Sequence, residues 1–169
     1  MKHYDKLIFV SESDTSTSPM AEAILQREFY LEDILISSKG LVVLFPEPIN
    51  PKAEAVLVSH SLSMKHHVSE QLTADDFDDR TLVLTMDQAQ MAQLLKDHEN
   101  ARNVFTLASY IRADKDIQDP YGGTLADYNR MYEELEQYVL RLSKILSLEE
   151  NRLGQEPAQE ILPVQEGVG

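Results

Sequence analysis

The stretch FVSESDTSTSPMAEAIL, residues 9–25, carries the pattern that decides the fold. An apolar run ending at Val10 leads into a loop of serines, threonines and carboxylates, after which Ser18-Pro19 opens a helix. Serine caps helices well, and proline is favoured in the first helical turn. This order is typical of a loop that holds an anion at a helix N-terminus. Yet the loop has no glycine, cysteine or basic residue, and it carries Glu12 and Asp14.

The rest of the sequence alternates short apolar runs with amphipathic segments. The patterns predict strands at 4–10, 33–38, 80–86 and 103–110, and helices from residue 18, at 52–60, at 87–98 and from residue 124. Strands that alternate with helices favour a parallel sheet covered on both faces. We therefore expect an α/β fold, a flavodoxin-like doubly wound sheet of four parallel strands. Ligands of such sheets bind beyond the carboxyl ends of the strands.

The domain is expected to cover residues 1–148, followed by an acidic tail at 149–169. The tail has two prolines, three glycines and no apolar helical stripe, and it holds five glutamates against one arginine. Such a composition predicts disorder.

Composition excludes several classes of function. The net charge of −14 disfavours nucleic acids and anionic membrane surfaces, which are bound mainly through lysine and arginine. The chain has no cysteine, hence no disulfide and no thiolate metal site, and its histidines lack the spacing of a zinc hydrolase. No stretch has the length and apolarity of a membrane span. We expect a cytoplasmic protein without a cofactor; the sequence does not indicate an oligomeric state.

Four motifs in order resemble those of the low-molecular-weight protein tyrosine phosphatase family: SPMAEA, SSKG, TMD and DPYGG. The resemblance covers residues 4–148, and the proline-rich stretch 40–57 is similar to that of bacterial members. It implies a loop of the form Cys, five residues, Arg, then Ser or Thr. The thiolate attacks phosphorus, the arginine and the loop amides hold the phosphate, and an aspartic acid before a proline protonates the leaving group.

The resemblance assigns a role to each residue of the candidate site. Ser11 stands at the position of the nucleophilic cysteine, Thr17 at that of the arginine, and Asp119 at that of the general acid. Asp14 stands where the family has an asparagine. The remaining positions are the loop residues Glu12, Ser13, Thr15 and Ser16, the nucleophile's support Ser18, the histidine behind the loop His67, and the aromatic cleft wall Tyr121.

These departures predict a protein whose catalysis is impaired or absent. A serine hydroxyl has a pKa far above the ~8.5 of a thiol and needs an adjacent base. Thr17 carries no charge to neutralise a phosphate dianion. We expect Glu12 and Asp14 at the rim of the pocket, where each would repel a phosphate charge by roughly 3 kcal/mol at ~5 Å and an effective dielectric of ~20. The predicted role is binding or regulation, with a protein partner or a weakly held phosphotyrosine-like ligand.

Two alternatives are open at this point. In one, Glu12, Asp14 and Asp119 converge into an oxygen site for a divalent metal, which would support altered hydrolase chemistry. In the other, the chain is an ordinary tyrosine phosphatase whose cysteines were replaced by serine at positions 11 and 16. The second alternative leaves Thr17 unexplained.

Overall fold

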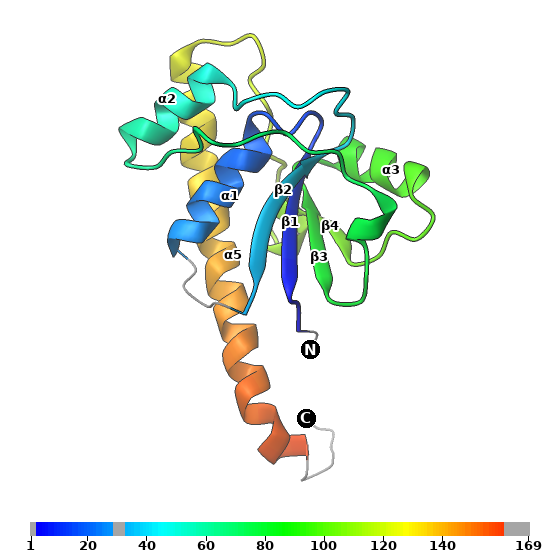
Figure 1. Cartoon of the computed structure of the whole chain (residues 1–169). Coiled ribbons are helices and arrows are strands. Elements are labelled where there is room, and N and C mark those ends of the chain that lie inside the picture. Colours follow the sequence, from blue (N-terminus) through cyan, green and yellow to red (C-terminus); the bar gives the residue numbers. More distant parts are fainter. Residues whose placement is uncertain (1–2, 29–32, 161–169) are drawn as a thin grey trace.

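The chain folds around one sheet of parallel strands (Figure 1). The computed structural model describes residues 3–28 and 33–160, with side chains described as far as residue 149. Within these ranges the sheet order is β2-β1-β3-β4 and every pairing is parallel. The strands are β1 (Lys6–Ser11), β2 (Leu35–Gly40), β3 (Thr81–Thr85) and β4 (Val104–Thr106). The expected α/β, flavodoxin-like fold with four parallel strands is confirmed.

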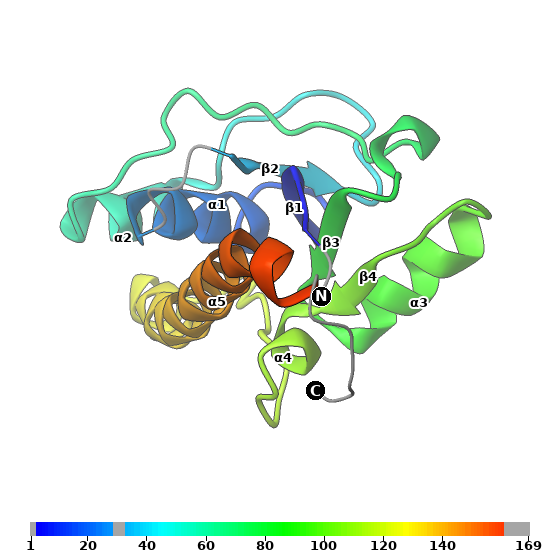
Figure 2. The same cartoon turned by 90° about the horizontal axis from the view of Figure 1, so that it is seen from below.

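Helices cover both faces of the sheet, as Figures 1 and 2 show. One face carries α1 (Thr17–Glu28), α2 (Pro51–Ser59) and α5 (Leu125–Glu160), the other α3 (Gln88–Asp97); η1 (Ala74–Asp76) and α4 (Leu107–Tyr110) are short. Alternate residues of β1 enter two hydrophobic clusters: Leu7 and Phe9 join the helices α1 and α5, and Ile8 and Val10 join Leu94 of α3. Burial on both faces explains why β1 reads as a continuous apolar run.

The last helix, α5, packs against α1 and α2 through the stripe expected from the sequence. Tyr138 and Ile145 are only partly buried, and the other members are buried: Tyr128, Met131, Leu135, Val139, Leu142 and Leu146. This spacing places them on one helical face. None of the described helices combines the length and apolarity needed to cross a membrane.

The strand predicted over 103–110 is too long. β4 ends at Thr106, whose hydroxyl accepts a hydrogen bond from the Ser109 amide at 3.0 Å, and residues 107–110 form α4. Threonine at an N-cap position satisfies a free amide of the first helical turn. The side chain of Thr106 therefore ends the strand inside an apolar run that has no proline or glycine.

The helix α5 also passes the predicted start of the acidic tail, because it continues to Glu160. Residues 149–160 are mostly glutamate, glutamine, arginine, leucine and alanine, which favour helices. A helix already anchored by packing extends through such residues without an apolar stripe of its own. The remainder of the predicted tail, 161–169, lies outside the described residues, and its disorder stays a prediction.

Two leucines of α5 test the assignment of the core. Leu142 is fully buried, whereas Leu148 is 66% exposed. We expect Leu142→Ala to lower the free energy of unfolding by about 2 to 5 kcal/mol, because it leaves a cavity. Leu148→Ala, the matched control, should change it by less than about 0.5 kcal/mol. Urea denaturation measures both, and equal losses would contradict this packing of α5.

Candidate functional site

The loop between β1 and α1 is held by the chain that follows β2. The amide of Leu41 donates to the Ser11 carbonyl at 3.0 Å, and the amide of Val42 donates to the Glu12 carbonyl at 3.0 Å. Gly40 must be glycine, since a Cβ there would lie 3.0 Å from the backbone carbon of Ser13 and 2.6 Å from a Val43 methyl group. The loop therefore rests directly on the carboxyl edge of the sheet, as expected for a ligand site.

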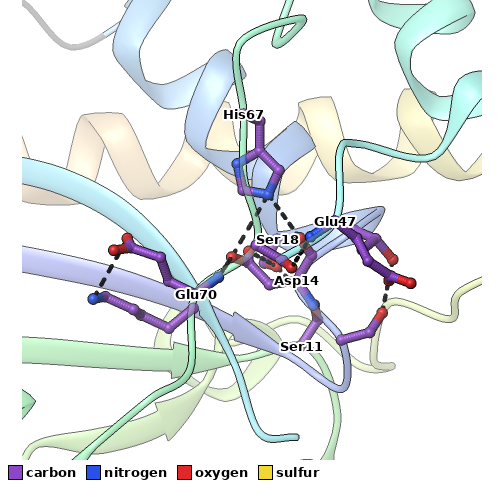
Figure 3. Close-up of polar contacts among 10 residues, drawn as sticks. Ser11, Asp14, Ser18, Glu47, His67 and Glu70 are labelled. Carbon is purple, nitrogen blue, oxygen red and sulfur yellow. Dashed lines mark hydrogen bonds and ion pairs between the residues drawn. The ribbon is translucent and has the colours of Figure 1, made fainter. Parts of the chain in front are cut away.

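The hydroxyl of Ser11 is bound into a chain of hydrogen bonds (Figure 3). Ser18 Oγ donates to Asp14 Oδ1 at 2.8 Å and lies 2.7 Å from Ser11 Oγ. A hydroxyl has one proton, so Ser18, having donated it to the carboxylate, must accept the proton of Ser11. Ser11 Oγ also accepts from the Asp14 amide at 3.1 Å. With Asp14 ionised, the proton of Ser11 thus points to Ser18, which donates its own proton to the carboxylate.

Asp14 is not at the rim where the sequence predicted it. Its side chain is 0% exposed, behind the loop, where Oδ2 accepts from the Glu70 amide at 3.1 Å. The φ of Asp14 is 60°, a left-handed conformation that aspartate tolerates and that turns the side chain inward. Of the two predicted rim carboxylates, only Glu12 is exposed.

The pKa of Asp14 is raised, chiefly because burial penalises its charged form. The nearby Ser38 hydroxyl, hydrogen bonds from Ser18 and the Glu70 amide, and the ring of His67 oppose the shift. His67 lies behind the loop with its side chain 6% exposed; its Nε2 is 2.7 Å from the Asp14 carbonyl oxygen and 3.6 Å from Oδ2. Four polar partners hold this one buried carboxylate in place.

The positions that would clamp a phosphate carry no cation. Thr17 and Ser16 are buried, and Ser16 Oγ has no hydrogen-bond partner among the described residues. In the hydrogen bonds and ion pairs of the described chain, no lysine or arginine side chain engages residues 11–17. Lys39 pairs with Glu70 and Asp76 instead. The loop keeps its backbone amides but lacks the charge that holds a dianion.

The turn DPYGG precedes α5 and carries the general-acid position. Tyr121 is 88% exposed, and Asp119 is also exposed, although neighbouring groups desolvate its carboxyl and raise its pKa. Both contribute to the raised pKa of Tyr128 and so lie near it; burial is the largest cause of that shift. An exposed acid with a raised pKa could donate a proton, but Ser11 offers it no activated nucleophile as a counterpart.

Sequence reasoning missed Asn50, which links the loop to α5. The amide of Asn50 donates to the Thr15 carbonyl at 2.7 Å, and its Nδ2 donates to the Tyr128 hydroxyl at 3.4 Å. Asn50 also caps α2 through its Oδ1. Asparagine before a proline signals the start of a helix, but nothing in that signal indicates the contact with the loop.

The oxygen site considered for a metal does not form. No group of three or more histidines, aspartates or glutamates in the described part of the chain is arranged to hold a metal ion. Asp14 is turned behind the loop, away from the exposed Glu12 and Asp119. The structure therefore does not support metal-assisted chemistry by these three carboxylates.

Replacing Asp14 by its neutral isostere tests the cost of the buried charge. The folded pKa is raised, so the folded protein keeps this proton to a higher pH than the unfolded chain, whose aspartates titrate near ~3.9. Stability due to Asp14 is therefore lost as pH rises from the unfolded pKa through the folded one. Asp14→Asn should stabilise the protein more at pH 7 than at pH 4, by on the order of 1 kcal/mol.

Urea denaturation at the two pH values measures this difference. Asp97→Asn, which removes an exposed carboxylate of α3, is the control and should show little dependence on pH. An Asp14→Asn variant less stable than the parent at pH 7 but not at pH 4 would reverse the expected sign and contradict the stated cause.

Comparisons with known proteins agree with this geometry. Residues 6–153 match the family model described as low molecular weight phosphotyrosine protein phosphatase. The low molecular weight protein-tyrosine-phosphatase PtpB of Staphylococcus aureus is 30% identical over 142 residues, which are 83% of this chain and 99% of the relative. YwlE arginine phosphatase from Geobacillus stearothermophilus has a similar structure, with a TM-score of 0.79, 28% identity, and coverage of 88% of this chain and 96% of that one.

One similar structure has serine at its active site. It is YwlE arginine phosphatase, solved as a cysteine-to-serine mutant with a phosphorylated active-site serine. The TM-score is 0.76 and the identity 31%, over 84% of this chain and 95% of that one.

Proposed function

The chain belongs to the low-molecular-weight phosphotyrosine protein phosphatase family, and we propose that it is a binding protein that has lost phosphatase activity. The resemblance read from its motifs is confirmed by the match over residues 6–153. The absence of cysteine from the whole chain removes the family's nucleophile. The proposed setting is the cytoplasm of a bacterium.

The direction of the hydrogen bonds at Ser11 carries this proposal. The family resemblance places an asparagine at position 14. An asparagine amide would donate to Ser18, which would then donate its own proton to the nucleophile and stabilise an anion there. Asp14 reverses this order, because an ionised carboxylate only accepts. Ser18 therefore donates to Asp14 and takes the proton of Ser11, which stays a neutral alcohol.

Charge supports the same conclusion. Loss of the arginine clamp removes charge-assisted hydrogen bonds worth about 1.5 to 3 kcal/mol. The carboxylate of Asp14 lies behind the loop in surroundings of low dielectric, where it opposes a second anion more strongly than an exposed carboxylate would. Binding of phosphate by the pocket is therefore expected to be weak.

Exposed apolar side chains beside the loop favour a protein as the partner. The segment after β2 is bonded to the loop through the Val42 amide, and it exposes 83% of Leu44 and 68% of Phe45. Tyr121, at the general-acid turn, is also exposed. Leu44 and Phe45 are adjacent in the sequence, and neighbouring exposed apolar side chains mark interaction surfaces more often than isolated ones do.

A second candidate is favoured by the phosphorylated serine of the YwlE mutant. In this candidate, the Ser11 oxygen bonds to phosphorus as the bond between phosphorus and the donor side chain breaks, and the proton of Ser11 passes to the leaving group. Without a thiolate leaving group or the arginine, the resulting phosphoserine is not hydrolysed. Mass spectrometry of the chain after incubation with phosphotyrosine and phosphoarginine peptides would detect a phosphoryl group on Ser11. The first candidate predicts no phosphoryl group on Ser11, whereas the second predicts a stable one.

Activity assays test the loss of catalysis. We expect the chain to hydrolyse para-nitrophenyl phosphate, phosphotyrosine peptides and phosphoarginine peptides at less than about a thousandth of the rate of the Staphylococcus aureus relative, because it lacks both an activated nucleophile and a clamp. Turnover within tenfold of that relative would refute the proposal. The natural codons at positions 11, 16 and 17 would show whether the serines are engineered.

Restoring the motif stepwise tests the reversed hydrogen bonds. The double variant Ser11→Cys with Thr17→Arg should recover little activity, and adding Asp14→Asn should raise turnover at least about tenfold, a change of about 1.4 kcal/mol. The thiol pKa, measured by the pH dependence of alkylation, should be lower in the triple variant. Replacing Glu12 by Gln instead of Asp14 is the control. Equal thiol pKa values with and without Asp14→Asn would contradict the proposed direction.

A further inference from the structure

A cavity lies behind the loop between β1 and α1, and Ser11 is not among the residues that line it. We call it the rear pocket; it has a volume of about 400 Å³. It is lined by Glu22 of α1, Ser37 and Ser38 of β2, residues 63–68, and Glu70. No residue of the proposed phosphate loop, 11–17, lines it.

The Ser38 hydroxyl is a buried polar group of the rear pocket. Ser38 is 4% exposed and lines the rear pocket, yet its Oγ has no hydrogen-bond partner among the described residues. Its hydroxyl lowers the pKa of Asp14 and that of Glu22 through hydrogen-bond interactions, so it lies near both carboxylates, but it has no close hydrogen bond to either. A buried hydroxyl without a partner is uncommon and indicates a ligand or a water.

His67 offers an acceptor to the same space. Its Nε2 carries a proton, because it lies 2.7 Å from the Asp14 carbonyl oxygen, which can only accept. In the neutral ring the other nitrogen, Nδ1, then has a lone pair. No hydrogen-bond partner of Nδ1 lies within the described chain. The ring therefore binds the loop on one side and leaves an acceptor free on the other.

Glu22 contributes a carboxylate to the rear pocket. Burial, the largest cause, raises its pKa, and the Gln26 amide donates to it at 3.2 Å. Glu70 adds a second carboxylate at the mouth, although Lys39 lies 3.6 Å from it. Lys65 and His66 line the pocket but are exposed. The interior of the rear pocket thus presents acceptors and negative charge.

We propose that the rear pocket binds a guanidinium group, the arginine side chain of a partner protein. The planar fork of a guanidinium presents several donors at once, which matches a carboxylate, a hydroxyl and an imidazole lone pair that surround one space. Met64 and Val68 provide apolar surface for the methylene stem. The net charge of −14 draws a basic partner toward the protein. This inference does not depend on whether Ser11 reacts.

Titration with blocked amino acids tests the proposal on the full chain. N-acetyl-arginine amide should bind saturably, with a dissociation constant of about 1 to 10 mM, as expected for one side chain. N-acetyl-citrulline amide keeps the shape but loses the charge, and should bind at least about tenfold more weakly. Free L-arginine distinguishes the source: its carboxylate should weaken binding if the pocket is built for a side chain.

Amide shifts in two-dimensional NMR locate the site. Saturable shifts are expected at Ser38 and His67, whereas the amides of Tyr121 and Gly122 should move little. Glu22→Gln should weaken binding about tenfold and Ser38→Ala about threefold, while Glu99→Gln, an exposed carboxylate outside the pocket, should leave it unchanged. The spectrum of each variant reports whether it is folded.

Three results would overturn the proposal. The first is equal binding of the arginine and citrulline compounds by the parent chain, a comparison that does not depend on any variant folding. The second is the absence of saturable shifts at Ser38 and His67 up to about 50 mM, well above the expected constant. The third is tighter binding of inorganic phosphate than of the arginine compound at the same amides, which would assign the pocket to an anion through Lys65 and His66.

Discussion

The hydrogen bond from Ser18 to the buried carboxylate of Asp14 constrains the rest of the site. A buried carboxylate is costly unless it is hydrogen-bonded, and here the donors are Ser18 and the Glu70 amide. Once Ser18 has given its proton to Asp14, it can only accept from Ser11. One carboxylate thus sets the direction of each hydroxyl between it and the pocket.

Asp14 also joins the loop to the segment that follows α2. His67 contacts the Asp14 carbonyl oxygen and the Glu70 amide donates to the Asp14 carboxylate, so both hold their segment against the loop. Gly40 allows the approach, because any larger residue would meet the loop backbone. The negative charge that a phosphate would bring to the front of the loop is already present behind it. Hydrogen bonds within the loop, between Ser11, Asp14 and Ser18, support its shape.

Local patterns predicted most of the fold, and long-range contacts account for what was missed. The run ending at Val10, the Ser18-Pro19 start and the stripe of α5 are each visible within one segment. The burial of Asp14 is not, because its partner His67 lies 53 residues away and its backbone adopts a left-handed turn. The end of β4 depends on a single capping hydroxyl, that of Thr106, within an apolar run. The sequence predicted which residues form the loop. The direction of their hydrogen bonds could be assigned only from the coordinates.

The presence of Ser18 and His67 at the positions expected for the family does not by itself argue that the family's reaction is kept. Ser18 and His67 contact Asp14 as structural partners, and removing either would leave the buried carboxylate with fewer polar partners. Such a loss is costly whether or not the protein turns over a substrate. The nucleophile and clamp positions have no such constraint, since Ser11 is one small hydroxyl and Thr17 makes no ion pair. Stability can therefore favour Ser18 and His67 whatever the protein does, whereas it places no such demand on Ser11 and Thr17.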